Sequence, residues 1–290
     1  MADTEVTWRG LTLGGDSPYI VQSITGWDDL PDTNDLSQPR VRGDGDHVGD
    51  LFSQARIVTV SGKIADQVNR DDLARALKRV TTIRSDLYDL TVETLGQALT
   101  SQARVLRRSL AVGDTYAVGE VPFSLQFRCP DPLRYGPEQT GSTGLPVAGG
   151  GLAWPLFQAG VLDWGAAGTP GQVTVTNDGD HEVGFTFDVV AGPTVGLQQG
   201  WEVSAVGQRI TYPTAVPAGQ TITVDTAAGT VLAEGTADRR DQLTNADWLI
   251  IPAADPDSGA PGSLTLQFTS LGGAFDPGSQ LVPRWKAASE

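Results

Sequence analysis

The chain has 290 residues, enough for two ordinary domains, and 39% of them are hydrophobic, so it can bury sizeable cores. Its formal net charge of -15 argues against an ordinary nucleic-acid-binding protein. The single cysteine, Cys129, excludes intramolecular disulfides and cysteine-based zinc sites, and we expect it to be a small buried hydrophobe at a strand end. Neither a signal peptide nor a run of roughly 18 apolar residues is visible, which predicts folding in a cytoplasm.

The first half of the chain predicts short strands, because apolar residues alternate with polar ones along most of its segments. The first such segment, 5–13, ends at Gly14-Gly15, and we expect 19–24 to be its hairpin partner. Further strands are predicted at 56–64, 88–95, 103–110 and 121–129.

One helix is predicted among these strands. Asn69 can cap its N-terminus. Leu73, Leu77 and Val80 then fall on one face at helical spacing, which predicts a single apolar stripe against the core.

The segment from Trp27 to Asp50 loses all periodicity and is rich in Asp, Gly, Pro and Asn. A loop of this length is unusual in a compact domain and predicts a function of its own. Residues 1–50 hold ten acids and three bases, whereas residues 51–108 hold six acids and ten bases. This asymmetry fits either simple solubility or complementary faces that meet between copies of the chain.

The second half predicts strands throughout, spaced by about ten residues with turns between them, as in a β-sandwich. Five of the seven tryptophans lie there. A tryptophan in a sandwich is usually part of the core or of an interface, but an exposed ring can stack on a sugar. Trp201 and Trp248 are therefore the candidates for glycan binding.

Chemistry-bearing motifs are weak. Gly15-Asp16-Ser17 and the distant Asp178-to-His181 segment resemble parts of a serine esterase, but the chain lacks the alternating α/β framework that such an enzyme needs. The segment Asp44 to Asp50 begins like a calcium loop, yet Ala55 stands where the loop needs a glutamate. We therefore expect no catalytic residues, no metal and no cofactor.

Four stretches, in this order, carry a resemblance to a known family. Each consists mostly of strands and turns, so their order and spacing matter more than any one motif. The first stretch is Tyr19–Ile24, followed by the polar segment that holds Arg40 and Arg42 and by the strand at 56–64. The second is Phe127–Tyr135, in which a strand stops at Asp131-Pro132. The third runs from Trp154-Pro155 through Asn177-Asp-Gly179 to Gly192-Pro193, and the fourth comprises the segments 219–226, 248–252 and 283–285.

Together these stretches resemble the distal tail proteins (Dit) of long-tailed bacteriophages, in the form seen among phages of actinobacteria. The resemblance implies a mainly β protein. Residues 1–135 would form a β-sandwich or barrel-like, ring-forming domain with one α-helix and an extended arm at about 27–52. Residues 136–290 would form a galectin-like β-sandwich.

The resemblance also implies a non-enzymatic virion protein at the phage tail tip, usually a homo-hexameric ring with a central channel. Its partners would be the tail tube protein, the tail-tip hub and the receptor-binding proteins, with genomic DNA only in transit and no membrane. The arm would contact a neighbouring subunit. The candidates for that contact are Trp27, Asp32, Asp35, Arg40, Arg42, Asp44 and Asp46. A carbohydrate-binding module and another tail-tube or tail-tip subunit remain the alternatives.

Overall fold

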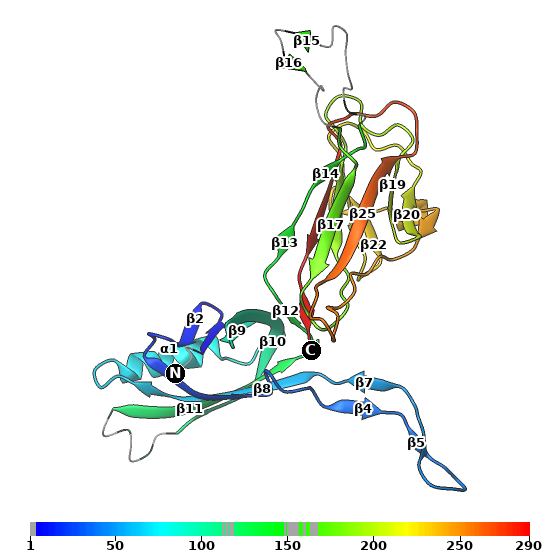
Figure 1. The fold of residues 1–290 in the computed structure, drawn as a ribbon. Helices are drawn as coiled ribbons and strands as arrows, with labels where there is room; N and C mark the ends of the chain where they lie inside the picture. The colour runs from blue at the N-terminus through cyan, green and yellow to red at the C-terminus, as the bar shows by residue number, and fades with distance from the viewer. Residues whose placement is uncertain are drawn as a thin grey trace. The chain divides into compact units, whose positions relative to one another are not determined.

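The structure is a computed structural model that describes residues 4–111, 119–147 and 168–290, the single positions 113, 116 and 149, and two short strands at 157–158 and 161–162. The chain divides into two compact units (Figure 1). Unit 1 comprises Met1–Pro137 together with Ser289–Glu290, and unit 2 comprises Glu138–Ala288. The predicted boundary after Tyr135 lies close to this division, but the return of the last two residues to unit 1 was not predicted.

Unit 1 is built on one antiparallel sheet that curls around a core. Its strand order is β2-β1-β9-β10-β11-β8-β3, and the short strands β12 and β27 lie off this path. The long strand β10 pairs with β9 through its first half and with β11 through its second half. The bounds are β1 (Glu5–Trp8), β2 (Leu11–Gly14), β3 (Tyr19–Thr25), β8 (Arg56–Ala65), β9 (Tyr88–Thr94), β10 (Gln97–Leu110), β11 (Glu120–Cys129), β12 (Arg134–Tyr135) and β27 (Ala288–Ser289).

The start of unit 1 corrects two expectations. The alternating segment 5–13 is two strands, because Arg9 and Gly10 adopt positive φ values of 48° and 80° and close a tight hairpin between β1 and β2. The predicted pairing of 19–24 with that segment is wrong, since β3 pairs with β8. A glycine inside the alternating run was the signal that the sequence offered for this turn.

Helix α1 (Arg70–Val80) covers one side of the core of unit 1 with the predicted stripe: Leu77 is buried, and Leu73 and Val80 pack partly against the core. The predicted cap is wrong, because the side chain of Asn69 makes no capping hydrogen bond. The carboxylate of Asp66 instead accepts hydrogen bonds from the backbone N–H groups of Val68 and Asn69, which orders the turn before the helix.

The core of unit 1 lies on the inward-facing residues of the sheet. Along β11 the exposure alternates strictly from Val121 to Phe127, with every second side chain buried. Cys129 ends this strand as a fully buried free thiol, as predicted, and burial raises its pKa. The same alternation leaves the opposite face of the sheet open.

Unit 2 is a sandwich of two antiparallel sheets, of seven and five strands. One sheet has the order β13-β26-β18-β21-β22-β23, with β14 paired to β26, and the other has the order β17-β25-β19-β20-β24. The bounds are β13 (Gln139–Thr140), β14 (Thr143–Gly144), β17 (Gln172–Asn177), β18 (Thr186–Val190), β19 (Trp201–Ala205), β20 (Gln208–Tyr212), β21 (Thr221–Asp225), β22 (Thr230–Ala233), β23 (Ala237–Asp238), β24 (Asn245–Ala246), β25 (Gly262–Ser270) and β26 (Gln280–Trp285). A separate pair, β15 (Phe157–Gln158) and β16 (Val161–Leu162), forms its own two-stranded ladder.

The core of unit 2 fills the space between the two sheets with aliphatic and aromatic side chains. The mainly β fold with one α-helix is thus confirmed over the described residues. Trp154 and Trp164 lie outside the described part of the chain. None of the described residues forms a helix with the length and apolar character needed to cross a membrane.

Candidate functional sites

The arm leaves unit 1 between β3 and β8, and its first residue is fixed by sterics. Gly26 follows β3 with a φ of 79°. A Cβ atom at this position would lie 1.9 Å from the carbonyl oxygen of Ile57 in β8. Both the positive φ and the close backbone approach favour glycine. The chain therefore departs from the sheet at a defined point.

Arg56 holds the root of the arm. Its side chain is fully buried, and its guanidinium donates hydrogen bonds to the carbonyl oxygens of Gly26 (3.0 Å), Trp27 (2.9 Å), Asp29 (2.5 Å) and Pro132 (2.9 Å). Burial, followed by the positive charge of Arg134, lowers the pKa of Arg56, but an arginine remains protonated in proteins. One cation thus binds the outgoing strand, the returning strand and the end of the domain together.

Trp27 and Arg134 complete this root. Trp27 is only 1% exposed, and the guanidinium of Arg134 lies 5.8 Å from the centre of its ring. Arg134 also forms an ion pair with Asp28 at 2.7 Å and donates to the backbone carbonyl of Glu290 at 2.8 Å. Trp27, predicted among the arm contacts, is therefore a core residue that offers no surface to another subunit in this structure.

The arm itself is a long two-stranded hairpin rather than an irregular loop (Figure 1). Near the root, β4 (Thr33–Asp35) pairs with β7 (Leu51–Ser53). Towards the tip, β5 (Gln38–Pro39) pairs with β6 (Asp46–His47). Backbone hydrogen bonds from Gln54 to Asp32 (2.7 Å) and from Leu36 to Asp50 (3.0 Å) continue the ladder. The abundance of Asp, Gly and Pro hid this ladder from sequence patterns.

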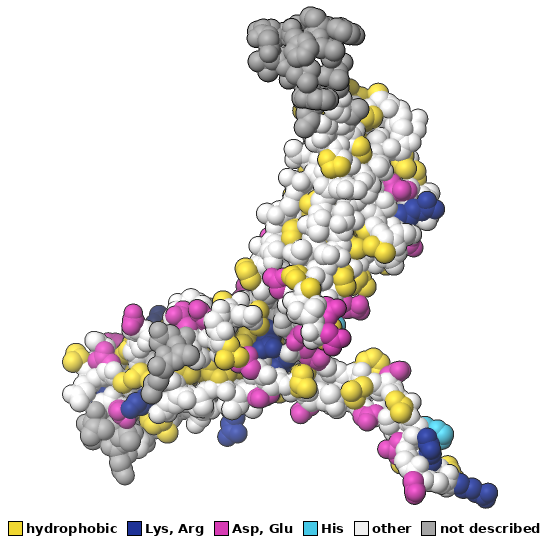
Figure 2. All heavy atoms as spheres, in the orientation of Figure 1, with side chains coloured by type: hydrophobic (Ala, Val, Ile, Leu, Met, Phe, Trp, Pro, Cys, Tyr) yellow, Lys and Arg dark blue, Asp and Glu magenta, His cyan; other side chains and the backbone are white. Residues whose placement is uncertain are grey.

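The remaining arm candidates are all exposed, namely Asp32, Asp35, Arg40, Arg42, Asp44 and Asp46. Figure 2 shows acidic, basic and hydrophobic side chains together on the surface of the arm. The sequence prediction missed the hydrophobic ones. Six large apolar side chains of the arm are exposed: Leu30 (78%), Leu36 (50%), Val41 (97%), Val48 (94%), Leu51 (62%) and Phe52 (55%). An exposed apolar series of this kind marks an interaction surface.

Sequence reasoning also missed the role of Arg56, although one signal was present. Arg56 falls in phase with Val58 and Val60 in an alternating strand, and those two side chains are buried. A charged residue on the buried face of a strand requires several hydrogen-bonding partners. Those partners come from segments 27 and 76 residues away, which a pattern along the chain cannot identify.

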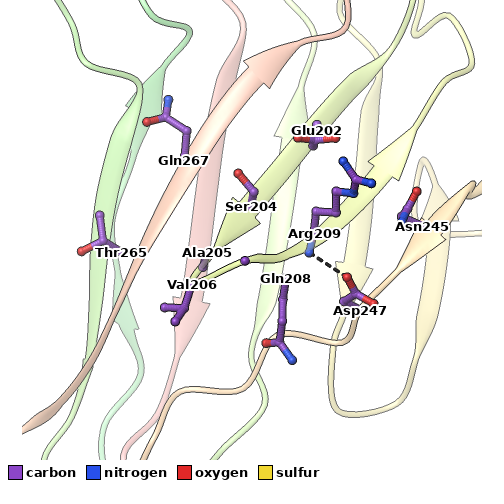
Figure 3. Close-up of a pocket in the computed structure, with 11 residues that line it drawn as sticks. Glu202, Ser204, Ala205, Val206, Gln208, Arg209, Asn245, Asp247, Thr265 and Gln267 are labelled. Carbon is purple, nitrogen blue, oxygen red and sulfur yellow. Dashed lines mark hydrogen bonds between the residues drawn. The ribbon is translucent and has the colours of Figure 1, made fainter.

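Unit 2 carries a polar groove of about 510 Å³ on the outer face of its five-stranded sheet (Figure 3). Its lining residues come from β19, β20, β24 and β25, from the turn at Val206-Gly207, and from Asp247 just after β24. The small Ser204 lies in register with Gln267 and Arg209, so the hollow forms between longer neighbours. Glu202 accepts a hydrogen bond from the hydroxyl of Thr211 at 3.0 Å. Among the described residues that line this groove, none is aromatic.

The two tryptophans predicted for glycan binding lie elsewhere. Trp201 is fully buried, stacked on Tyr212 at 5.6 Å and edge-on to Phe187 at 5.9 Å, so a sugar has no access to its ring in this structure. Trp248 is partly buried against the core, and the guanidinium of Arg240 lies 5.5 Å from its ring centre. Neither ring is among the residues that line the polar groove, although Trp248 directly follows the lining residue Asp247.

No family model and no curated protein matches the sequence. Solved structures do match. The Dit protein of phage SPP1, described as a paradigm of the hub adsorption apparatus in phages that infect Gram-positive bacteria, aligns with a TM-score of 0.65 at 16% identity over 98% of both chains. A chain of the phage P2 baseplate, in its activated conformation with Ca, aligns with a TM-score of 0.50 at 9% identity, again over 98% of both chains. The chain therefore shares the fold of the SPP1 Dit protein over nearly its whole length.

Proposed function

We propose that this chain is a non-enzymatic structural protein of a phage tail tip. It forms a ring, six-membered by analogy with the family it resembles, that joins the tail tube to the hub and the receptor-binding proteins. Genomic DNA crosses the ring through a central channel during ejection. The observation that carries this proposal is the fold likeness to the SPP1 Dit protein, which extends across 98% of both chains and includes both units. At 16% identity that likeness concerns the fold, so assembly must be tested directly.

The arm supports assembly on physical grounds. An isolated two-stranded hairpin is at best marginally stable in water. This hairpin nonetheless exposes large apolar side chains, and Val41 and Val48 are more than nine-tenths exposed. Burial of a valine side chain on a partner contributes about 1.5–3 kcal/mol. We infer that the surface of a neighbouring subunit covers the arm in the assembled ring.

The charges on the arm suit a selective contact. Asp32, Asp35, Asp44 and Asp46 are exposed along it, and Arg40 and Arg42 lie at its tip. Exposed charges keep an apolar surface soluble before assembly and restrict which partner it can accept. Rim charges of this kind act mainly on the association rate and on its salt dependence.

An arm deletion tests the proposal. The carbonyl of Asp32 accepts a hydrogen bond from the N–H of Gln54, so these two residues are neighbours that a short turn can connect. Replacing residues 33–53 with Gly-Asn-Gly removes the arm and leaves Arg56 and its carbonyl partners in place. We expect both units to remain folded and ring formation with the tail partners to fail. Native mass spectrometry and negative-stain imaging would report the assembly state.

A matched variant separates apolar contacts from the mere presence of the arm. Leu36→Ser, Val41→Ser and Val48→Ser in one protein keep the ladder and all charges but remove much of the exposed apolar surface. We expect this variant to assemble as poorly as the deletion. Full rings from the armless protein would show that the arm is dispensable. A wild-type protein that stays monomeric even with its tail partners would refute the ring itself.

Carbohydrate binding by unit 2 is the alternative from another class. The polar groove favours it, because carboxylate, amide and guanidinium groups can bind sugar hydroxyls. The burial of Trp201 removes one of the two rings on which the prediction rested. A tail-tube subunit or another tail-tip subunit is the second alternative, and a tube made of stacked rings in the assembly experiment would favour it.

A further inference from the structure

The open face of the unit 1 sheet has an unusual composition. On β8 and β11, the side chains opposite the core include Thr59, Ser61, Ser124 and Gln126, all partly exposed. Ser109 of β10 continues this row, in register with Ser124. The face therefore presents mainly hydroxyl and amide groups, with Ile57, which is 37% exposed and in register with Arg128, as an apolar side chain among them. Such a surface is suited to hydrogen bonding and poorly suited to a hydrophobic partner.

Three arginines lie at one end of this face. Arg104 of β10 and Arg128 of β11 are direct cross-strand partners, and Arg107 is in register with Gln126. Direct cross-strand neighbours have Cβ atoms about 5 Å apart, and diagonal neighbours about 7–8 Å apart. Like charges placed directly opposite each other destabilise a sheet. The register thus places Arg104 and Arg128 directly opposite each other with Arg107 nearby, and this grouping of like charges comes at a cost to the free protein.

These arginines have no acidic partner within the described chain. Five ion pairs are found among the described residues, and none of them involves Arg104, Arg107 or Arg128. At the other end of the face, Glu120 is already paired with Lys63 at 2.6 Å. A hollow of about 300 Å³ lies beside Arg107, lined by Thr59, Ser109, Ser124 and Gln126.

We propose that this arginine face, defined as Arg104, Arg107 and Arg128 with the adjoining hydroxyl and amide side chains, binds the phosphate backbone of nucleic acid without reading its sequence. Arginine forks, hydroxyls and amides are the groups that commonly contact phosphate oxygens. The face has the opposite sign to the chain as a whole, whose net charge is -15, so the contact is weak and strongly dependent on salt. The inference rests on the proposed function only for the source of the nucleic acid.

The acidic arm of a second copy is the competing occupant. It offers carboxylates, but it also exposes large apolar side chains such as Val41, Val48 and Phe52. Beside the arginines the chain exposes Ile57 (37%) and Leu106 (41%), and these two side chains would leave most of the apolar surface of the arm uncovered. The backbone of a duplex presents phosphate oxygens and no large apolar side chain that needs covering, and it therefore fits the face better.

The test is fluorescence anisotropy with a labelled 30-base-pair duplex of mixed sequence and the full-length protein, between 50 and 200 mM salt. Three phosphate contacts give a slope of about -2.7 for log affinity against log salt, which is about a 40-fold loss of affinity over this range. Arg104→Gln, Arg107→Gln and Arg128→Gln together should abolish that slope and weaken binding at 50 mM by about 10-fold or more. Circular dichroism would confirm that the variant is folded.

A charge-matched control decides whether position matters. Lys78, Arg79 and Arg84 are exposed at and after the end of α1, and their replacement by glutamine changes the net charge by the same three units. We expect this control to bind DNA with nearly the wild-type slope. Equal losses in the two triple variants, or no binding of the wild-type protein at 50 mM salt, would overturn the proposal.

Two further outcomes are distinct from these. If the arginine variant keeps its affinity for DNA but loses self-association in sedimentation velocity, the face receives the acidic arm of another copy and the proposal is wrong. Ring assembly is measured separately with the arm deletion. DNA binding by the face without ring formation would support this inference and refute the proposed function. Ring formation without DNA binding would support the proposed function and refute this inference.

Discussion

Replacing Arg56 with alanine should loosen the root of the arm and destabilise unit 1. Four buried or partly buried carbonyl oxygens would lose their donor, at distances that are now 2.5–3.0 Å. An unsatisfied buried acceptor costs about 1–3 kcal/mol. Water that enters the vacated space and the relief of a buried charge offset part of this loss. We therefore expect a net decrease of roughly 3 kcal/mol in the free energy of unfolding.

Urea unfolding, monitored by hydrogen exchange in the segments β3 and β8, would measure the free energy of unfolding of unit 1 alone. Arg56→Lys is a useful intermediate, because its ammonium keeps the charge but has three donors on one atom in place of the planar fork. Arg75→Ala is the control: Arg75 forms an exposed ion pair with Asp72 at 2.5 Å, and exposed pairs of this kind contribute little to stability. An Arg56→Ala loss no larger than the Arg75→Ala loss would refute the reasoning.

Two predictions concern unit 2. Trp201→Ala should lower the free energy of unfolding of unit 2 by about 3–5 kcal/mol, because the ring is fully buried. A Trp201→Ala protein that keeps its stability but loses glycan binding would contradict this core role. Asp276 accepts hydrogen bonds from the backbone N–H groups of Gly278 (2.8 Å) and Thr194 (2.7 Å), which lower its pKa from 3.8. The ionised carboxylate of Asp276 therefore stabilises unit 2 above pH 3.8, and this stabilisation is lost as the pH falls below that value. The melting temperatures of wild type and Asp276→Asn should differ at pH 7 and converge below pH 3.8. A difference that stays constant with pH would contradict this prediction.

The sequence predicted elements better than it predicted their partners. Strong alternation located β8 and β11, and helical spacing of Leu73, Leu77 and Val80 located α1. The partner of β3 could not be predicted in this way, because β8 lies beyond the arm and no local signal links them. Strand pairing at long range depends on which faces fit together, whereas periodicity reports only which face of each strand is buried.

The candidate sites show the same division. The length and composition of the segment after Trp27 indicated that it leaves the compact domain, and its polar candidates are exposed as expected. The arginine face was hidden, because Arg104, Arg107 and Arg128 come from two strands and share a face only once β10 and β11 are in register. A bulge between Val105 and Arg107 sets that register, and a sequence pattern gives no position for it.

The double pairing of β10 has a consequence for how unit 1 folds and unfolds. This single strand of 14 residues holds β9 along its first half and β11 along its second half. Neither half of the sheet can complete its hydrogen bonds until β10 is in place, and β10 must satisfy both at once. Unit 1 should therefore unfold as one cooperative unit on heating, and a pulling force applied to either half of the sheet should be transmitted to the other half through β10.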